Sequence, residues 1–334
     1  MWKRFTLLPL LLVLAGCYRQ SSLNPQGPAA RQIGNVEWSI VALFCLITLV
    51  MWILIAIVAT RPRGTLKEHA PVDIGGGQKW IMVGGFTIPV LILAGVFISG
   101  LDVLADFPVH DGAMLMPAQM RIVGHQWWWE VYYLQGTLQR HFITANEIHI
   151  PAGQPVDIDL ASYDVIHSFW VPELHGKVDL IPGVRNRIRI QADRPGTYRG
   201  QCAEYCGEEH ARMILLVIAQ TPEDYQRWVS NQLQDAAAPV SAQQIEGQQM
   251  FMTRACLLCH TIRGTLAQGR VGPDLTHLAS RQKIASNLLD NNTANLAAWS
   301  THAQSLKPGV VMPNISEFDG EQLNALVAYL QNLH

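Results

Sequence analysis

The sequence predicts a multidomain protein with a two-helix transmembrane hairpin, an all-β sandwich and an all-α C-terminal domain. Three observations predict this order. Two runs of 22 residues contain no charged side chain, segments in the middle of the chain alternate polar and apolar residues, and the last 94 residues look helical. At about 100–200 residues per domain, a chain of 334 residues allows two or three units.

Composition indicates that part of the chain lies outside water. Only 15% of the residues are charged, whereas about 25% is usual for globular proteins, and 49% are hydrophobic. The formal net charge of −2 provides no dense basic face, which argues against nucleic acid as a partner. Glycine and proline are too ordinary in amount for a disordered or collagen-like chain. A folded, membrane-attached protein fits these values.

Residues 1–16 have the pattern of a secretory signal peptide. A basic start precedes an apolar run that ends in Leu14-Ala15-Gly16 and is too short to span a bilayer. The following Cys17 resembles the lipidated cysteine of a bacterial lipobox, which would become the new N-terminus. The alternative is an ordinary signal peptide with an incidental cysteine. Residues 17–35 are predicted to be a polar spacer behind the lipid.

Residues 36–106 are predicted to form a hairpin of two transmembrane helices. Trp38–Ala59 and Trp80–Leu101 are uncharged, and about 20 apolar residues suffice to cross a bilayer. The loop between these runs contains the basic residues Arg61, Arg63, Lys67 and Lys79. The positive-inside tendency therefore predicts a cytoplasmic loop with both chain ends outside, in agreement with the lipobox.

Residues 115–220 have the pattern of a β-sandwich or barrel. Polar and apolar residues alternate at period two in Val156–Leu160 and in Arg187–Ile190, which is typical of half-buried strands. Turn-forming glycine and proline residues separate such segments. A β-sandwich or barrel of about 105 residues fits this pattern best.

The chain after residue 220 is predicted to be helical. Thr221 and Pro222 are suited to the N-cap and the first turn of a helix. Residues 221–240 are expected to contain this helix and then an alanine-rich linker. Residues 241–334 are expected to form a helical domain that ends in an amphipathic helix from Glu321 to Leu333.

The segment Cys202-x3-Cys206-x3-His210-x2-Met213 places two thiols, an imidazole and a thioether within twelve residues. Sulfur and imidazole donors suit copper, and a His/Cys site with a weak axial methionine is typical of electron transfer. Two cysteines exceed the needs of one such copper, and the second histidine could be His167, 35 residues before Cys202. A disulfide or a zinc site is the alternative for the cysteine pair alone.

With the stretch Ser162–Phe169, this pattern resembles subunit II of the heme–copper cytochrome c oxidases, whose cupredoxin-like domain carries the dinuclear copper centre CuA. The resemblance implies two coppers bridged by two thiolates, with one histidine on each copper. The implied ligands are Cys202, Cys206, His167, His210, Met213 and the backbone carbonyl of Glu204. The Glu204 side chain would bind magnesium shared with subunit I. Such a centre leaves no open position for substrate and suits electron relay.

Three consecutive tryptophans follow Gly124-His125-Gln126. Their position behind the predicted membrane spans also fits an interfacial aromatic belt. The family resemblance implies instead that electrons enter CuA at Trp127, with Trp128 and Trp129 building the aromatic surface around it. The nearby His175 fits no ligand position of the family and is expected at the surface.

Cys256-Leu-Leu-Cys259-His260 is a c-type heme attachment motif, with two thioether bonds and a proximal histidine. A redox-active dithiol is the alternative. A low-spin heme also needs a sixth ligand, usually methionine, and Met312 lies about fifty residues further on. This spacing resembles the small class I cytochromes c, as do Gly247-x3-Phe251 and Gly272-Pro273. The resemblance implies that the Pro273 carbonyl orients His260.

Together, the two resemblances describe subunit II of a caa-type oxidase, with a cytochrome c domain fused behind CuA. Such a subunit would accept electrons from a cytochrome c or a quinol:cytochrome c reductase. It would pass them through heme c and CuA to heme a of subunit I, where oxygen reduction and proton pumping occur. Subunit I, subunit III and lipid are the implied partners. The implied location is the bacterial plasma membrane, with the CuA and heme domains on the periplasmic face.

Two other classes of function share parts of this pattern. A quinol oxidase subunit II keeps the fold but lacks the CuA cysteines, so Cys202 and Cys206 argue against it. A membrane-tethered heme–copper carrier outside any oxidase would share every motif. One departure from the family concerns proton uptake. Many relatives carry a glutamate near the start of the second span, whereas here no carboxylate falls between Asp73 and Asp102.

Overall fold

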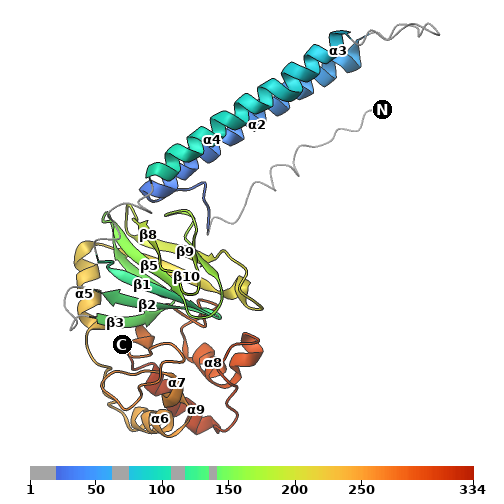
Figure 1. Cartoon of the computed structure of the whole chain (residues 1–334). Helices are drawn as coiled ribbons and strands as arrows, with labels where there is room; N and C mark the ends of the chain where they lie inside the picture. Colours follow the sequence, from blue (N-terminus) through green and yellow to red (C-terminus); the bar gives the residue numbers. More distant parts are fainter. Residues whose placement is uncertain (1–19, 62–74, 107–116, 135–140) are drawn as a thin grey trace. The chain divides into compact units, whose positions relative to one another are not determined.

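The computed structural model describes residues 20–61, 75–106, 117–134 and 141–334 (Figure 1). The chain divides into two compact units, Arg31–Pro108 on the one hand and Met1–Ala30 with Val109–His334 on the other. The expected signal peptide, Cys17 and most of the basic loop lie outside the described residues.

The smaller unit consists of long apolar helices. Helix α2 spans Pro28–Thr60, and a second helical stretch runs through α3 (Gly75–Trp80), the π-helix η1 (Ile81–Thr87) and α4 (Ile88–Asp106). Both stretches are long and apolar enough to cross a membrane, which confirms the two predicted helices. Their hydroxyl groups bond to carbonyls of the same helix, as for Ser39 with Asn35 and Ser99 with Gly95. Helix α2 begins at Pro28, inside the stretch expected to be a spacer.

The predicted β-sandwich is confirmed as two five-stranded sheets. One sheet has the order β3-β2-β1-β5-β8 and the other β4-β10-β9-β6-β7, with parallel pairs β1–β5 and β4–β10. The strands are β1 (Met120–His125), β2 (Trp128–Leu134), β3 (His141–Ala145), β4 (Glu147–Pro151), β5 (Val156–Ser162), β6 (His167–Trp170), β7 (Val178–Leu180), β8 (Asn186–Ile190), β9 (Gly196–Cys202) and β10 (Ile214–Gln220). Alternate side chains of β1 and β2 fill the space between the sheets.

The polar face of β5 is more buried than its alternating sequence predicts. Asp157 and Asp159 are only 8% and 4% exposed, although their neighbours on the strand face the core. Arg189 and Arg187 of the adjacent strand β8 cover them, with N–O distances of 2.6 and 2.7 Å. The period of two therefore identifies the strand correctly, while cross-strand ion pairs close its outer face.

Helix α5 (Pro222–Gln232) begins where the sequence predicts. The Thr221 hydroxyl accepts a hydrogen bond from the Asp224 amide, and Pro222 occupies the first turn. Tyr225 and Val229 of α5 join the core of the sandwich.

The C-terminal domain is mainly helical, as predicted. Its elements are α6 (Ala242–Thr253), α7 (Cys256–Cys259), η5 (Leu278–Ser280), β11 (Lys283–Ile284), β12 (Leu289–Asp290), α8 (Thr293–Leu306) and α9 (Gly320–Leu330). Helices α6 and α9 pack side by side (Figure 1). They cross at Gly247, and Phe251 and Tyr329 meet edge to face. The short hairpin β11–β12 has no counterpart in the sequence-based expectation.

Candidate copper site and heme pocket

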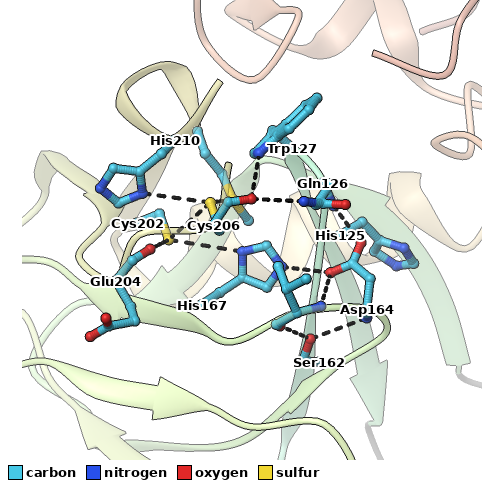
Figure 2. Close-up of polar contacts among 12 residues, drawn as sticks. His125, Gln126, Trp127, Ser162, Asp164, His167, Cys202, Glu204, Cys206 and His210 are labelled. Atoms are coloured by element: carbon cyan, nitrogen blue, oxygen red, sulfur yellow. Dashed lines mark hydrogen bonds and ion pairs between the residues drawn. The ribbon is translucent and has the colours of Figure 1, made fainter. Parts of the chain in front are cut away.

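The predicted copper ligands meet at one end of the sandwich (Figure 2). Cys202 ends strand β9, and Cys206 lies in the following loop. His210 begins the short helix η4 (His210–Arg212), and Met213 directly precedes β10. His167 comes from strand β6, which pairs with β9 at Phe169 and Cys202. The sheet therefore brings His167 to four ligands that are close together in sequence.

The donor atoms are close enough to share metal ions. The two cysteine sulfurs lie 3.8 Å apart, too far for a disulfide bond of about 2.05 Å. The Cys202 Sγ lies 3.9 Å from His167 Nδ1 and 3.2 Å from the Glu204 carbonyl oxygen. The Cys206 Sγ lies 3.5 Å from His210 Nδ1 and 3.9 Å from Met213 Sδ. Each sulfur thus has its own set of partners, which fits two metals bridged by two thiolates better than one tetrahedral zinc.

Burial and the contact between the thiols determine their protonation. Cys202 and Cys206 are 3% and 4% exposed. The contact with Cys206 lowers the pKa of the Cys202 thiol to about 4, and the same contact raises the pKa of Cys206. Cys202 is ready to bind as thiolate, and metal binding must displace the proton on Cys206.

A carboxylate that sequence reasoning missed orients His167. The Oδ1 of Asp164 lies 2.8 Å from His167 Nε2, which leaves Nδ1 facing Cys202. The other carboxylate oxygen of Asp164 accepts a hydrogen bond from the Gln126 amide at 2.7 Å. Such a partner on the remote nitrogen fixes the ring and the tautomer of a ligand histidine. Asp164 lies only three residues before His167, and this spacing is the signal that could have found it.

Trp127 contacts the copper site directly. It lies in the turn between β1 and β2, and its indole Nε1 donates a hydrogen bond to the Cys206 carbonyl at 2.9 Å (Figure 2). Gln126 Nε2 donates to the same carbonyl at 2.8 Å. Trp128 stacks on the His125 ring with a centroid distance of 4.4 Å. The prediction that Trp129 builds a surface is wrong, because the turn directs this side chain into the core, where it is fully buried.

The sequence also makes predictions for Glu204 and His175. The Glu204 side chain is 43% exposed, and its carboxylate lies 3.6 Å from Lys177 Nζ. His175 was expected at the surface, and that prediction is wrong, because it is only 6% exposed. Its Nδ1 lies 3.1 Å from the Gly176 carbonyl, and burial lowers its pKa. His175 is a neutral buried histidine at physiological pH.

The C-terminal domain encloses a large, mainly apolar cavity between the predicted heme ligands. Cys256 and Cys259 on α7 and the following His260 line one part of it, and Met312 lines another. The Pro273 carbonyl lies 2.8 Å from His260 Nδ1, so that Nε2 remains available to a metal. Burial lowers the pKa of His260, which keeps the imidazole neutral, as a metal ligand must be. These donors and the apolar lining fit a heme.

Two amide side chains that sequence reasoning missed hold the loop that carries Met312. Gln304 Nε2 donates to the Met312 carbonyl at 3.0 Å. The backbone amide of Gln304 donates to the Asn314 side-chain oxygen at 2.9 Å. Both contacts span the end of α8 and the following loop, and no sequence pattern announces them. Trp127 of the copper domain lines the same cavity.

The fold and the two sites define a class of protein, namely a membrane-anchored electron-transfer protein with a copper domain and a cytochrome c domain. The comparisons agree. Residues 132–220 match the family of the periplasmic domain of cytochrome c oxidase subunit II, and residues 244–334 match the cytochrome c family.

Relatives extend the match to the whole chain. Cytochrome c oxidase subunit 2 of Alkalihalophilus pseudofirmus is 34% identical over 100% of this chain and 98% of its own length. Subunit 2 of Bacillus subtilis is 27% identical over 99% and 98%. Quinol oxidase subunit 2 of Bacillus cereus is 31% identical over only 70% of this chain and 81% of its own length. The chain belongs to the cytochrome c oxidase subunit II family.

Proposed function

We propose that the chain is the electron-input subunit of a heme–copper terminal oxidase. It accepts electrons in its C-terminal domain and delivers them through the copper domain to subunit I, where oxygen is reduced to water and protons are pumped. One observation carries this proposal. The Trp127 side chain lines the cavity that contains His260 and Met312, and it also bonds to the carbonyl of the copper ligand Cys206. A single side chain therefore connects the two redox sites.

The residues divide into two sets of ligands. Bound heme and a dinuclear copper centre supply one-electron redox chemistry. Cys256 and Cys259 would attach the heme covalently, with His260 and Met312 as its axial ligands. Cys202 and Cys206 would bridge the coppers. His167, His210, Met213 and the Glu204 carbonyl would complete the copper site. Buried, preformed donors favour rapid electron transfer because they need not move when the charge changes.

The donor set argues against catalysis of a substrate reaction on this chain. Two thiols, two imidazoles, a thioether and a carbonyl lie together here and would satisfy two coppers without an open position. His260 and Met312 would likewise both serve as ligands of a bound heme iron, which would leave no position for a substrate. Oxygen chemistry is therefore assigned to subunit I.

Two alternative functions are less well supported. A quinol oxidase subunit II would not need Cys202 and Cys206, which here lie with His167 as a potential metal cluster. A membrane-tethered carrier outside an oxidase would have the same ligands. The full-length match to oxidase subunits from two organisms supports the oxidase instead.

The proposal also includes the membrane location, the lipidation and the partners of the subunit. Both apolar helices would cross a bacterial inner membrane, with the 61–79 loop in the cytoplasm and both metal domains on the periplasmic side. Cys17 would be lipidated after removal of the signal peptide. Subunits I and III would be the partners, with a cytochrome c or a quinol:cytochrome c reductase as donor. The partly exposed Glu204 carboxylate is available for magnesium at the contact with subunit I.

Purification of the detergent-solubilised complex tests the proposal. We expect this chain to co-purify with a subunit that contains heme a, to retain heme after denaturation and to contain a dinuclear copper signal. Retention of heme by the denatured chain would follow from the two thioether bonds at Cys256 and Cys259. A chain that purifies alone with both metals would support the tethered carrier and contradict the oxidase.

A further inference from the structure

The heme domain contacts the copper domain through the tip of its β11–β12 hairpin. Ala285, Ser286 and Asn287 form this tip and have left-handed φ values of 54°, 58° and 63°. Three consecutive non-glycine residues in this region are costly for the backbone and persist only where other contacts stabilise them. Ser286 and Asn287 are nevertheless 3% and 8% exposed. The residues that bury the tip must therefore supply the stabilising contacts.

These contacts come from the copper domain. The Ser286 hydroxyl donates to the Trp127 carbonyl at 2.7 Å. The Asn287 side-chain amide donates to the carbonyls of Asn146 and Ile214, each at 3.1 Å. Three backbone carbonyls of the copper domain thus accept hydrogen bonds from the hairpin tip. The Asn146 carbonyl also accepts one from the Leu216 amide at 3.0 Å, so the tip adds a second hydrogen bond there.

Lys307 makes a second contact with the same carbonyl. Its side chain is 1% exposed, and its ammonium group donates to the Trp127 carbonyl at 2.7 Å and to the Arg212 carbonyl at 3.3 Å. Both acceptors belong to the copper domain, although Lys307 belongs to the heme domain. Burial lowers the pKa of Lys307 to about 7, and the two carbonyls supply the acceptors that its buried amine needs in the docked arrangement.

A carboxylate makes the reciprocal contact. Glu147 of the copper domain is 2% exposed, and its Oε1 accepts hydrogen bonds from the backbone amides of Gln282 and Lys283 at 2.8 and 3.0 Å. Two sets of hydrogen bonds therefore fix the hairpin on the copper domain. Side chains at the tip donate to copper-domain carbonyls, and the Glu147 carboxylate accepts from backbone amides at the start of β11. The contact is polar and specific rather than a general apolar surface.

The docked domains enclose Trp127. Its side chain is 9% exposed, and a Cβ atom placed on Gly309 of the heme domain would lie 3.2 Å from its ring. A Cβ atom on Gly207 of the copper loop would lie 2.9 Å from the same ring. Both glycines have positive φ values, 78° and 116°, so their backbones approach the indole in a conformation that favours glycine.

We propose that Ala285–Asn287 and Lys307 form a built-in docking site, here called the seat, that holds the heme domain on the copper domain with Trp127 enclosed. Because Trp127 is enclosed, an external protein donor cannot reach it and must dock on the heme domain. The seat fixes the spacing between the two redox sites and thus deepens the proposed function, on which its role in electron transfer rests. Lys307 and Ser286 are positioning residues in this scheme.

Amide hydrogen exchange in the purified, metal-loaded complex tests the seat without using activity. Lys307→Met keeps an apolar chain of similar length but removes the ammonium group. Ser286→Gly removes the hydroxyl and tolerates the positive φ. We expect Lys307→Met to speed exchange at Gln282 and Lys283 by about tenfold, because the hydrogen bonds from Lys307 Nζ to the Trp127 and Arg212 carbonyls are lost. We expect a smaller increase for Ser286→Gly.

Arg254→Met is the matched control, because Arg254 pairs with Glu317 inside the heme domain. It should leave exchange at Gln282 and Lys283 at the parental rate. Exchange within α6 and α9 should stay parental in all three variants. Parental exchange at Gln282 and Lys283 in both seat variants would overturn the inference. An equal increase throughout the heme domain would also overturn it, because that result indicates general destabilisation.

Electron transfer within the complex tests the consequence. After rapid photoreduction of the heme, one electron leaves the ferrous iron and one electron reduces the copper pair, with no transfer of atoms. We expect this step to be slower in Lys307→Met than in Arg254→Met, with parental heme potential and copper EPR spectrum. A parental rate would overturn the role of the seat. A parent complex without heme and copper signals would refute the proposed function, while hydrogen exchange would still test the seat.

Discussion

At the scale of single residues, the copper site depends on the close approach of the Cys202 and Cys206 thiols. The sulfurs lie 3.8 Å apart in a buried site, and each faces a different histidine. A hydroxyl group in place of either thiol would be a harder and much weaker ligand for copper. The heme ligands lie in another domain with its own core. The two sites should therefore respond independently to loss of a ligand.

We expect Cys206→Ser to abolish or severely disrupt the dinuclear copper while leaving heme c intact, because serine cannot bridge two coppers. Copper analysis and the EPR spectrum of the purified complex measure the first effect, and the heme absorption spectrum measures the second. An unchanged copper content of this subunit in the variant would contradict the assignment of Cys206.

His149 is a residue whose protonation should affect stability. It is 8% exposed, stacks on Trp228 of α5 at 4.0 Å and lies 2.9 Å from the Gln220 side chain. Burial lowers its pKa from the ordinary value of 6.5 to about 4. Between these two pH values the unfolded state binds a proton that the folded state does not. Above pH 6.5 the imidazole is neutral in both states, and burial of His149 does not lower the unfolding free energy through protonation. As the pH falls from 6.5 towards 4, protonation of the unfolded state lowers the unfolding free energy.

His149→Phe should remove this dependence, because phenylalanine stacks but does not titrate. Between pH 6.5 and 4, the parent should lose about 3 kcal/mol of unfolding free energy relative to the variant. Chemical unfolding of the copper domain at several pH values measures the difference. Other titrating groups are shared by both proteins and cancel. Parallel pH profiles would show that His149 titrates normally.

At the scale of elements, the heme domain depends on the crossing of α6 and α9. A Cβ atom on Gly247 would lie 1.9 Å from the backbone carbonyl oxygen of Ala325, a distance that the backbone cannot accommodate without a shift. The glycine thus permits the close approach of the two helices. Phe251, one turn further on, packs against Tyr329 of α9.

We expect Gly247→Ala to lower the unfolding free energy of the heme domain by about 3 kcal/mol, since overpacking forces the helices apart. Gly320→Ala is the control, because a Cβ atom at Gly320 would have no atom within 4 Å. Thermal unfolding of the loaded protein, followed by heme absorption, distinguishes the two. Equal melting temperatures would contradict the close helix crossing.

Elements with a local signal could be predicted from the sequence, and elements that depend on distant contacts could not. The signals that predict them are local in the sequence. They are the two apolar runs, the cap at Thr221 and the Cys/His spacing of both motifs. By contrast, the β11–β12 hairpin is two residues long on each side, and its conformation depends on carbonyls of the copper domain. The burial of Trp129 likewise depends on the turn at Trp127, which lies before strand β2.

The same distinction applies to the candidate sites. Ligand residues follow from donor chemistry and spacing, because a metal restricts both. Which groups orient these ligands depends on the tertiary structure. Asp164 reaches His167 over three residues, whereas Gln304 reaches the Met312 carbonyl across a loop. A sequence carries no periodic signal for a contact of this second kind.

At the scale of the whole molecule, the central claim is an order of electron transfer. The chain between α5 and α6 is bound to the heme domain, since Asn332 donates hydrogen bonds to the carbonyls of Ala237 and Ala238. Arg263 also donates to the Gln232 carbonyl at 2.6 Å. The linker expected at residues 221–240 is therefore attached rather than free. With Trp127 enclosed, the heme domain is the part of the chain that an external protein donor can reach.

Stopped-flow mixing of the oxidised complex with a reduced cytochrome c tests this claim most directly. The heme absorption and the copper signal report the two sites separately. We predict that the heme of the Cys256–His260 motif is reduced first and that the copper centre follows, at a rate independent of donor concentration. Reduction of copper before heme, or at a rate that rises with donor concentration while the heme remains oxidised, would contradict the account.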